Sequence, residues 1–346
     1  MKKNLLKTIF LGASIAFSFN LISCADASDD DTADEKAGSK FASIIGGTVT
    51  GSEAYKSSDD DYIFVEGRTI TIGNLIVSTH EVTQKEFQRY CFFSNQTIEI
   101  AETCGSNTIG AEIETEPSEK YGLGDDFPAY GVSWYDAIAY CNLRSIAEGL
   151  TPVYKVGGKT GLCCWEGALT KTEGTSIKYA GPAETNALWD SVEMNGTANG
   201  YRLPTEAEWE YIARCGDNGL PDKLTDYAGS DEIDTVSWYD ENSEEKVHPV
   251  NTKAPNCHGI YNLSGNVSEW VWDWYGAVSS ETAATGNSSG KSRVLRGGSA
   301  ISPLKCSSVS YRDASKPYNR MRTKCSLACT GCVYALTGFR VVRNAD

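Results

Sequence analysis

Residues 259–274 carry the oxygen atoms best suited to hold an ion. Asn262, Gly265 and Glu269 form the pattern Asn-x-x-Gly-x-x-x-Glu, which places an amide oxygen, turn carbonyls and a carboxylate within one short loop. Ca²⁺ prefers oxygen ligands of these kinds. The pattern therefore predicts a calcium-binding loop, with an ordinary turn leading into a strand as the alternative.

Cysteines are the second group of residues that could do chemistry. The chain has 12 of them, and setting aside Cys24 near the N-terminus leaves an odd number, so at least one thiol has no intramolecular disulfide partner. Cys325, Cys329 and Cys332 form Cys-x-x-x-Cys-x-x-Cys, a spacing that could hold a metal ion. We expect several disulfides instead, because thiols of exported proteins pair. The sequence leaves their connectivity open.

The N-terminal residues have the features of an export signal. Three lysines precede an apolar run over residues 9–21, as in a signal peptide. The run ends in Leu21-Ile22-Ser23-Cys24, which resembles a bacterial lipobox. We predict that residues 1–23 are removed and that Cys24 carries the lipid; a simple secretory signal is the alternative.

An acidic segment follows the predicted lipid anchor. Residues 25–40 contain six Asp or Glu and almost nothing apolar. Such a segment cannot bury enough surface to offset the cost of ordering it. We therefore expect residues 24–60 to form a flexible tether and residues 61–346 to form the folded domain.

The overall charge restricts the kind of partner. The chain has 31 Lys and Arg against 46 Asp and Glu, a net charge of −15, and loss of the leader's three lysines makes it −18. Nucleic-acid binding needs clustered basic residues, so no nucleic-acid partner is expected. Contact with a membrane is expected through the lipid anchor only.

Local patterns predict the main elements of the domain. β-branched residues around a glycine predict a hairpin over residues 61–78. Capping boxes that begin at Thr83, Ser133 and Thr205 predict three helices, which end near residues 91, 148 and 214. Residues 151–200 show no sustained period and are expected to form loops and short strands. Alternating tryptophans at 270, 272 and 274 predict a strand with its aromatic side chains on one face.

Four motifs, in this order along the chain, resemble those of the formylglycine-generating (sulfatase-modifying factor) domain family. They are Arg202-Leu203-Pro204-Thr205-Glu206-Ala207-Glu208-Trp209-Glu210, residues 262–270, Arg296-Gly297-Gly298-Ser299, and Gly338-Phe339-Arg340-Val341-Val342-Arg343. The resemblance extends over residues 62–343. It implies a single loop-rich α+β domain with a C-type-lectin-like fold. It also implies a structural Ca²⁺ bound by the side chains of Asn262 and Glu269 and the carbonyls of Gly265 and Val267.

The resemblance does not extend to catalysis. The enzymes of this family resemble one another in two cysteines, five residues apart, that follow the Arg-Gly-Gly-Ser block and bind copper. Here Cys306 stands alone after that block. We therefore expect no copper and no enzymatic activity. The alternative is a divergent copper oxidase acting on a protein cysteine, in which Cys306 works with Cys325, Cys329 or Cys332.

The C-terminal region also resembles the variable proteins of diversity-generating retroelements, some of which are spirochaetal lipoproteins. Those proteins use the same scaffold to bind ligands through mutagenised residues that precede a Gly-Phe-Arg ending. The resemblance implies a ligand-binding loop surface over residues 300–337, for a protein or glycan on another cell. It also implies a lipid-anchored place in the cell envelope, on the outer-membrane surface of a spirochaete-like bacterium. The implied contact residues are Ile301, Ser302, Lys305, Cys306, Ser310, Asp313, Ala314, Ser315, Lys316, Tyr318, Asn319, Met321 and Arg322.

Two further readings of the same region stay open. It could be an ordinary surface loop of a non-variable paralogue, and the three-cysteine stretch Lys324 to Leu336 favours this because it lengthens the loop before Gly-Phe-Arg. The protein could also be a structural envelope lipoprotein without a specific ligand.

Overall fold

The computed structural model describes residues 40–56, 62–94, 103–104, 107–108, 117–221, 223–320 and 336–345. The predicted leader, the Cys24 anchor and the acidic segment up to residue 39 lie outside these residues. The helices are α1 (Gln84–Tyr90), α2 (Trp134–Ala147), α3 (Ala187–Asp190), α4 (Glu206–Ala213) and α5 (Ile233–Val236), with short 3-10 turns η2 (Glu53–Tyr55), η3 (Leu162–Cys164) and η4 (Leu304–Ser307). Among the described residues, no helix is long and apolar enough to cross a membrane.

The domain begins earlier in the chain than we expected. Strands β1 (Phe41–Ile44) and β2 (Gly47–Thr50) lie inside the predicted tether, and they pair antiparallel with β4 (Leu75–Ser78) and β3 (Thr69–Ile72), respectively. Both pairings keep the same register, so residues 41–50 and 69–78 form one long ribbon, interrupted at residues 45–46 and 73–74. The predicted hairpin was therefore wrong in its pairing, because β3 and β4 each find a partner upstream.

The three predicted capping boxes are confirmed. Thr83, Ser133 and Thr205 each accept a hydrogen bond from a backbone N–H three residues later, and the acidic side chain there accepts one in return. This reciprocal arrangement satisfies two donors that the first helical turn would otherwise leave without partners. It starts α1, α2 and α4 at the predicted residues.

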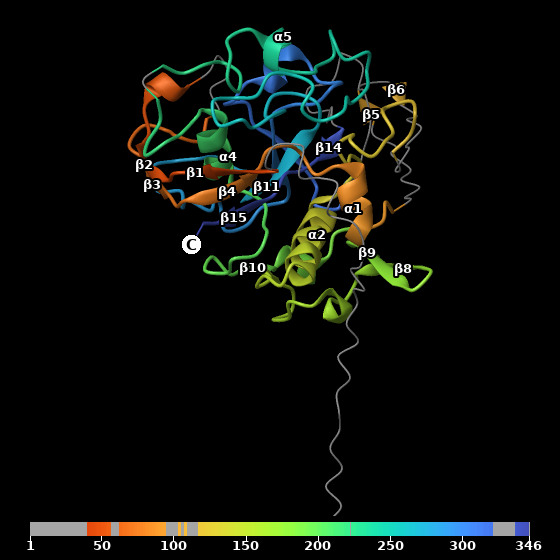
Figure 1. Ribbon diagram of the computed structural model, residues 1–346. Coiled ribbons are helices and arrows are strands. Elements are labelled where there is room, and N and C mark those ends of the chain that lie inside the picture. Colours follow the sequence, from red (N-terminus) through yellow and green to blue (C-terminus); the bar gives the residue numbers. More distant parts are fainter. Residues whose placement is uncertain are drawn as a thin grey trace, which may run out of the picture.

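A four-stranded sheet lies at the centre of the molecule (Figure 1). Its order is β13 (Asp313–Ser315), β12 (Arg293–Arg296), β11 (Ser268–Trp274) and β14 (Thr337–Gly338), with β14 parallel to β11. The predicted tryptophan strand is confirmed as β11. The last strand, β15 (Val342–Asn344), leaves this sheet and pairs with β4 of the N-terminal ribbon.

Small strand pairs occupy the periphery. They are β5 (Thr103–Cys104) with β6 (Asn107–Thr108), β7 (Tyr154–Lys155) with β10 (Glu193–Met194), and β8 (Leu169–Glu173) with β9 (Ser176–Ala180). The β7–β10 pair and the β8–β9 hairpin are the short strands that we expected, together with loops, over residues 151–200. The turn of this hairpin contains Gly174 at φ +61°, a conformation that suits glycine.

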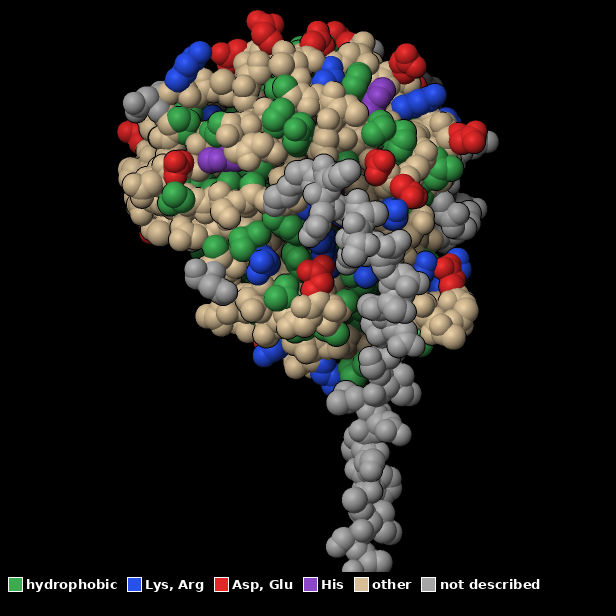
Figure 2. All heavy atoms as spheres, viewed as in Figure 1, with side chains coloured by type: hydrophobic (Ala, Val, Ile, Leu, Met, Phe, Trp, Pro, Cys, Tyr) green, Lys and Arg blue, Asp and Glu red, His purple; other side chains and the backbone are tan. Residues whose placement is uncertain are grey.

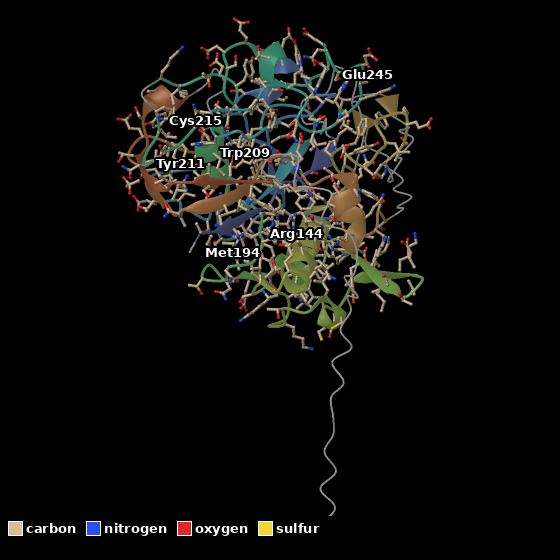
Figure 3. All side chains as sticks on the ribbon, viewed as in Figure 1. Arg144, Met194, Trp209, Tyr211, Cys215 and Glu245 are labelled. Atoms are coloured by element: carbon tan, nitrogen blue, oxygen red, sulfur yellow. A yellow bond between two sulfur atoms is a disulfide. The ribbon has the colours of Figure 1, made fainter. Side chains whose placement is uncertain are left out.

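Helix α4 joins the ribbon to the central sheet. Figure 3 shows Trp209 and Tyr211 pointing to different sides of this helix. The Trp209 indole donates a hydrogen bond to Glu269 of β11 (2.8 Å), and the Tyr211 hydroxyl donates one to the carbonyl of Ile45 in the ribbon (2.9 Å). A second apolar core forms around α2, where the Trp134 indole donates to the carbonyl of Val271 (2.9 Å).

The acidic composition is visible on the surface. Figure 2 shows Asp and Glu side chains along the upper rim of the molecule, where Figure 1 places α5. The chain around α5 exposes seven acidic residues: Asp226, Asp231, Glu232, Asp234, Glu241, Glu244 and Glu245. This rim is unsuited to a phosphate backbone.

Candidate functional site

The predicted calcium loop is held tightly by its neighbours. Asn262 and Asn266 have φ of +58° and +63°, and Gly265 has +78°. A Cβ at Gly265 would lie 2.2 Å from the Trp238 carbonyl oxygen, so glycine is required there. The side-chain amide of Asn266 accepts from the His248 N–H (2.9 Å) and donates to the His248 carbonyl (3.2 Å). These protein contacts thus hold the loop from several sides.

Glu269, the predicted carboxylate ligand, is committed to other partners. Its Oε1 accepts from Arg340 Nη2 at 2.6 Å, and its Oε2 accepts from Arg340 Nε at 2.7 Å and from the Trp209 indole at 2.8 Å. Parallel pairing of β11 with β14 brings Arg340 next to this side chain. Without Glu269 the predicted donor set contains no charged ligand, so the set does not fit Ca²⁺ in this geometry. Calcium binding by the protein stays a prediction.

Asn262, Gly265 and Val267 also serve the fold itself. The Asn262 amide oxygen accepts from the Asn251 N–H at 3.2 Å, and the Gly265 N–H donates to the Gly297 carbonyl at 2.8 Å. Val267 is fully buried in a small core cluster. These contacts use the Asn262 amide oxygen and the Gly265 N–H, whereas the Asn262 amide nitrogen is buried without a hydrogen-bond partner.

A buried acidic residue, Glu81, lies beside the loop and was not among the predicted ligands. Glu81 is fully buried, its Oε1 has no hydrogen-bond partner, and its Oε2 lies 3.4 Å from the Asn266 amide nitrogen. Burial, and secondarily the charge of Glu269, raise the pKa of Glu81 well above its ordinary value. The local sequence does not predict this raised pKa, because its causes, burial and the charge of Glu269, depend on residues distant in the chain.

We expect the Glu81→Gln variant to be more stable than the wild type at neutral pH, by about 1 to 3 kcal/mol. At low pH both the folded and the unfolded chain hold this proton. As the pH rises past the ordinary pKa of 4.5, only the unfolded chain releases it, so the wild type loses stability up to the raised folded pKa. Urea unfolding of both proteins at several pH values measures the difference. Parallel pH curves for the two proteins would contradict the assignment to Glu81.

Two buried arginines hold the C-terminal segment at its ends. Arg312 donates to both oxygens of Glu206, through Nε at 2.6 Å and Nη2 at 2.9 Å. Arg320 donates to both oxygens of Asp136, at 2.7 Å each. Bidentate pairs of this kind are strong and directional. Residues 313–319 therefore run between two fixed points on helices α4 and α2.

The carboxylates in these pairs lie in the first turns of helices α2 and α4. Asp136 caps α2, where it also accepts from the Ser133 N–H at 2.9 Å. Glu206, in the first turn of α4, also accepts from Arg296 at 2.7 Å. Their role as anchors of the C-terminal segment depends on contacts across more than a hundred residues and has no local signal.

The structure reduces the set of residues predicted to contact a ligand. Five of them are buried and were wrongly assigned to the surface: Ile301, Ser302, Cys306, Ser310 and Ser315. Six are exposed or partly exposed: Lys305, Asp313, Ala314, Lys316, Tyr318 and Asn319. We call these six the display surface. Met321 and Arg322 lie outside the described residues. Ala300 and Thr337, at the ends of the predicted loop surface, are buried.

Tyr311 lies between Lys305 and the other residues of the display surface along the chain. The Lys305 ammonium lies 5.9 Å from the centre of the Tyr311 ring, and Arg312 then leads directly into β13. Among the described residues, β13 is an edge strand of the sheet, with β12 on one side only. The Lys316 ammonium reaches the carbonyl of Lys291 at 3.3 Å.

Comparison with known proteins agrees with this architecture. A family profile described as "Sulfatase-modifying factor enzyme 1-like domain" matches residues 28–345. The chain belongs to this family. The predicted α+β, C-type-lectin-like fold is confirmed, because solved proteins of this type superimpose on most of the chain.

Individual relatives differ in how much of the chain they match. Chaperone protein LppX of Paenibacillus barcinonensis is 29% identical over 300 residues, which cover 78% of this chain and 89% of that protein. The formylglycine-generating enzyme of Streptomyces coelicolor is 39% identical over 131 residues, only 33% of this chain and 40% of the enzyme. The structure of Treponema denticola variable protein 1 aligns with a TM-score of 0.61 at 28% identity, covering 88% of this chain and 95% of that one.

The residues after Ser299 occupy the part of the chain in which we looked for the two copper-binding cysteines of the sulfatase-modifying factor family. Cys306 is buried, and burial raises the pKa of its thiol to about 11. A thiol in this state is a poor nucleophile and a poor ligand at neutral pH. Ser302 and Ser307 have the five-residue spacing described above for the two cysteines, and both serine side chains are buried. Cys325, Cys329 and Cys332, the predicted alternative partners of Cys306, lie outside the described residues.

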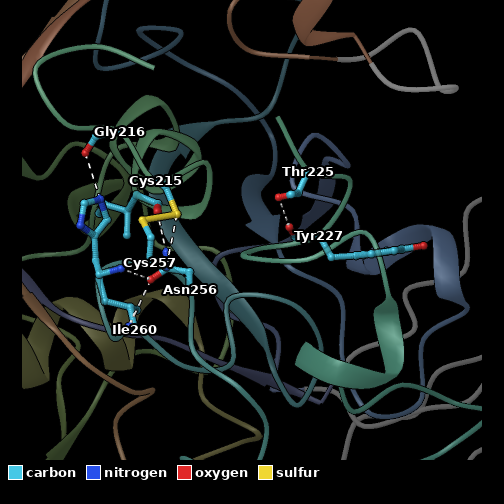
Figure 4. Close-up of a disulfide and its surroundings, with 9 residues drawn as sticks. Cys215, Gly216, Thr225, Tyr227, Asn256, Cys257 and Ile260 are labelled. Atoms are coloured by element: carbon cyan, nitrogen blue, oxygen red, sulfur yellow. Dashed lines mark hydrogen bonds between the residues drawn. A yellow bond between two sulfur atoms is a disulfide. The ribbon is translucent and has the colours of Figure 1, made fainter. Parts of the chain in front are cut away.

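The described residues contain one disulfide, between Cys215 and Cys257. It connects the end of α4 to the loop that precedes Asn262 (Figure 4). They contain no cluster of three or more His, Cys, Asp or Glu residues that could hold a metal ion.

Proposed function

We propose that this sulfatase-modifying factor family member is a lipid-anchored cell-envelope protein that binds a macromolecular ligand through the display surface. The predicted lipobox at Cys24 supports the anchor. The match to Treponema denticola variable protein 1 over 88% of the chain supports the use of the C-terminal segment.

The two arginine anchors are the observation that carries this proposal. Arg312 and Arg320 are both buried and both bidentate, so the scaffold holds residues 313–319 at each end independently of the side chains between them. A binding surface of this kind can change its contact residues without losing the fold. Its position on a rigid scaffold also lowers the entropy lost on binding.

The side chains of the display surface suit adaptable recognition. Tyr318 offers a large amphipathic ring, Asn319 offers both a donor and an acceptor, and Lys305 and Lys316 offer positive charges. The strand beneath them, β13, has three residues and is followed at once by Lys316 and Pro317. A short edge strand with a nearby lysine and proline is protected against aggregation by strand pairing.

We expect replacement of Lys305, Lys316, Tyr318 and Asn319 by alanine to weaken ligand binding at least about tenfold, which corresponds to 1.4 kcal/mol. The melting temperature should change little, because both arginine anchors remain. Binding is measured on a glycan array and on an array of extracellular proteins, with Lys171→Ala/Lys178→Ala on the β8–β9 hairpin as the matched control. Unchanged binding by the four-residue variant would contradict the proposal.

Sequencing the gene in independent isolates tests whether the surface is diversified. We expect substitutions at the codons of the display surface, confined to adenine positions, and a nearby template repeat with a reverse transcriptase. Arg312, Arg320 and the buried residues Ser302, Ser310 and Ser315 should not vary. An invariant segment would indicate a fixed paralogue that uses the same surface for a single ligand.

A second candidate function is a chaperone activity, which the match to Chaperone protein LppX favours because it covers 89% of that protein. The display surface would then contact non-native chains. Suppression of aggregation of a chemically unfolded exported enzyme by the wild type, and its loss in the alanine variant, distinguishes this activity from binding to a folded ligand.

A further inference from the structure

Asparagine followed by glycine occurs three times in the chain, at Asn195-Gly196, Asn199-Gly200 and Asn218-Gly219. Such a pair can react without an enzyme, because the backbone nitrogen of the glycine can attack the side-chain carbonyl carbon of the asparagine. Glycine permits this attack best, since it has no Cβ to shield the nitrogen. The three pairs share this local chemistry, so their surroundings in the fold decide which of them reacts.

The turn that follows β10 holds the Asn195 side chain in a reactive arrangement. The amide oxygen Oδ1 of Asn195 accepts hydrogen bonds from the Thr197 N–H (3.2 Å) and from the Thr197 hydroxyl (2.9 Å). The Ala198 N–H donates to the Asn195 backbone carbonyl (3.2 Å) and closes the turn. During attack on Cγ, negative charge develops on Oδ1, where donors that are already in position stabilise it. Thr197 therefore lowers the barrier to a reaction at Asn195.

The attacking nitrogen of Gly196 is unobstructed. Among the described residues, the Gly196 N–H has no hydrogen-bond partner. Gly196 and Thr197 are both exposed, and a Cβ built at Gly196 would meet no atom within 4 Å. Water can therefore reach the turn, both to accept the proton of this N–H and to take part in the later hydrolysis.

The other two asparagine–glycine pairs are protected by their surroundings. Gly200 is buried, and a Cβ there would lie 2.3 Å from the carbonyl oxygen of Thr151. The Asn199 amide oxygen accepts a single bond, from the Thr151 N–H at 2.9 Å. In the third pair the Gly219 N–H donates to the Tyr211 hydroxyl at 3.1 Å, so its nitrogen is engaged. The fold thus leaves Asn195 as the reactive member of the three.

We propose that Asn195 is a site of spontaneous deamidation, assisted by the hydrogen bonds from Thr197. The Gly196 nitrogen loses its proton and bonds to Asn195 Cγ, the Cγ–Nδ2 bond breaks, and ammonia leaves with that proton. The product is a succinimide ring. Water then opens the ring at one of its two carbonyls and yields aspartate or isoaspartate. Either product adds a negative charge to the turn.

The modified turn is one that contacts the C-terminal strand. The Asn344 side-chain amide donates to the carbonyls of Gly196 (2.8 Å) and Ala198 (3.2 Å), and Arg202 Nη2 donates to Asn344 Oδ1 (2.8 Å). Figure 1 accordingly shows the C-terminus beside β10. Isoaspartate inserts an extra methylene into the backbone before Gly196 and displaces the carbonyl that Asn344 contacts. Deamidation therefore loosens the turn from β15 as the protein ages.

Incubation of the purified full-length protein at mildly alkaline pH, followed by peptide mapping with isoaspartate reference peptides, tests the site. We expect Asn195 to deamidate at least about tenfold faster than Asn199 and Asn218, a difference in barrier of about 1.4 kcal/mol. The same chain unfolded in urea is the matched control. There the three pairs should react at similar rates, because the contacts that distinguish them are lost.

Two substitutions test the geometry. Gly196→Ala shields the attacking nitrogen and should slow the reaction at Asn195 at least about tenfold. Thr197→Val removes the hydroxyl donor but keeps the N–H donor, so it should slow the reaction by less. The melting temperature of each variant shows that the fold is intact. No deamidation at Asn195, an earlier reaction at Asn199 or Asn218 in the folded protein, or an unchanged rate in either variant would overturn the proposal.

Discussion

Replacement of Arg340 by methionine is expected to destabilise the protein by about 3 to 5 kcal/mol, since it leaves a buried carboxylate without its charged partner. Arg340 donates to both oxygens of Glu269, and both side chains are at most 1% exposed. Glu81 lies close enough to raise the electrostatic cost further. Urea unfolding at neutral pH measures the loss as a lower transition midpoint.

A double variant separates the charge effect from loss of packing. In Arg340→Met/Glu269→Gln the uncompensated charge is gone, so most of the lost stability should return. If the double variant is as unstable as Arg340→Met, the loss comes instead from the bonds that Arg340 donates to the carbonyls of Ser78 and Tyr261.

Loss of the Cys215–Cys257 disulfide has the second large expected effect. The bridge spans a sequence separation of 42 residues. For a loop of that length the chain-entropy estimate gives about 4 kcal/mol. We expect Cys215→Ala/Cys257→Ala to remain folded at room temperature but to unfold at a correspondingly lower urea concentration.

The variant should stay folded because the two segments also share hydrogen bonds (Figure 4). The Asn256 amide donates to the Ile212 carbonyl at 2.9 Å, and a ring nitrogen of His258 lies 3.0 Å from the Gly216 carbonyl oxygen. A reductant should lower the stability of the wild type by more than that of the double variant, because the double variant already lacks this bridge. A further loss in the reduced double variant would assign part of the effect to disulfides elsewhere in the chain.

The arrangement of the C-terminal segment explains how one scaffold could carry different binding surfaces. The anchoring charges of Arg312 and Arg320 are neutralised inside the protein, whereas the side chains of the display surface are exposed or partly exposed, and Tyr318 packs only in part against the core. Changes confined to the display surface should therefore cost little stability. The same changes at the buried residues Ser302 or Ser310 would disturb packing and hydrogen bonds, which is why the structure removes them from the predicted contact set.

Short local motifs in the sequence were sufficient to predict the helices and the family. A capping box needs only a hydroxyl residue and an acidic residue three positions apart, so Thr83, Ser133 and Thr205 could be read directly from the sequence. The tryptophan strand was equally readable, because alternation reports the two faces of a strand. The ordered motifs from Arg202 to Arg343 were sufficient to assign the fold, which the comparisons confirm.

Only the tertiary structure decided which charged and extended segments meet. The pairing of β1 with β4, of Glu269 with Arg340 and of Arg320 with Asp136 depends on contacts between residues far apart in the chain. Local sequence patterns carry no information about such partners, because a carboxylate that caps a helix looks the same whether or not an arginine approaches it. Burial also depends on contacts between distant segments. Ser302 and Lys305 lie in the same loop, yet Ser302 is buried and Lys305 is exposed. The motifs alone therefore specified the scaffold, and the folded chain specified the residues that its surface offers to a ligand.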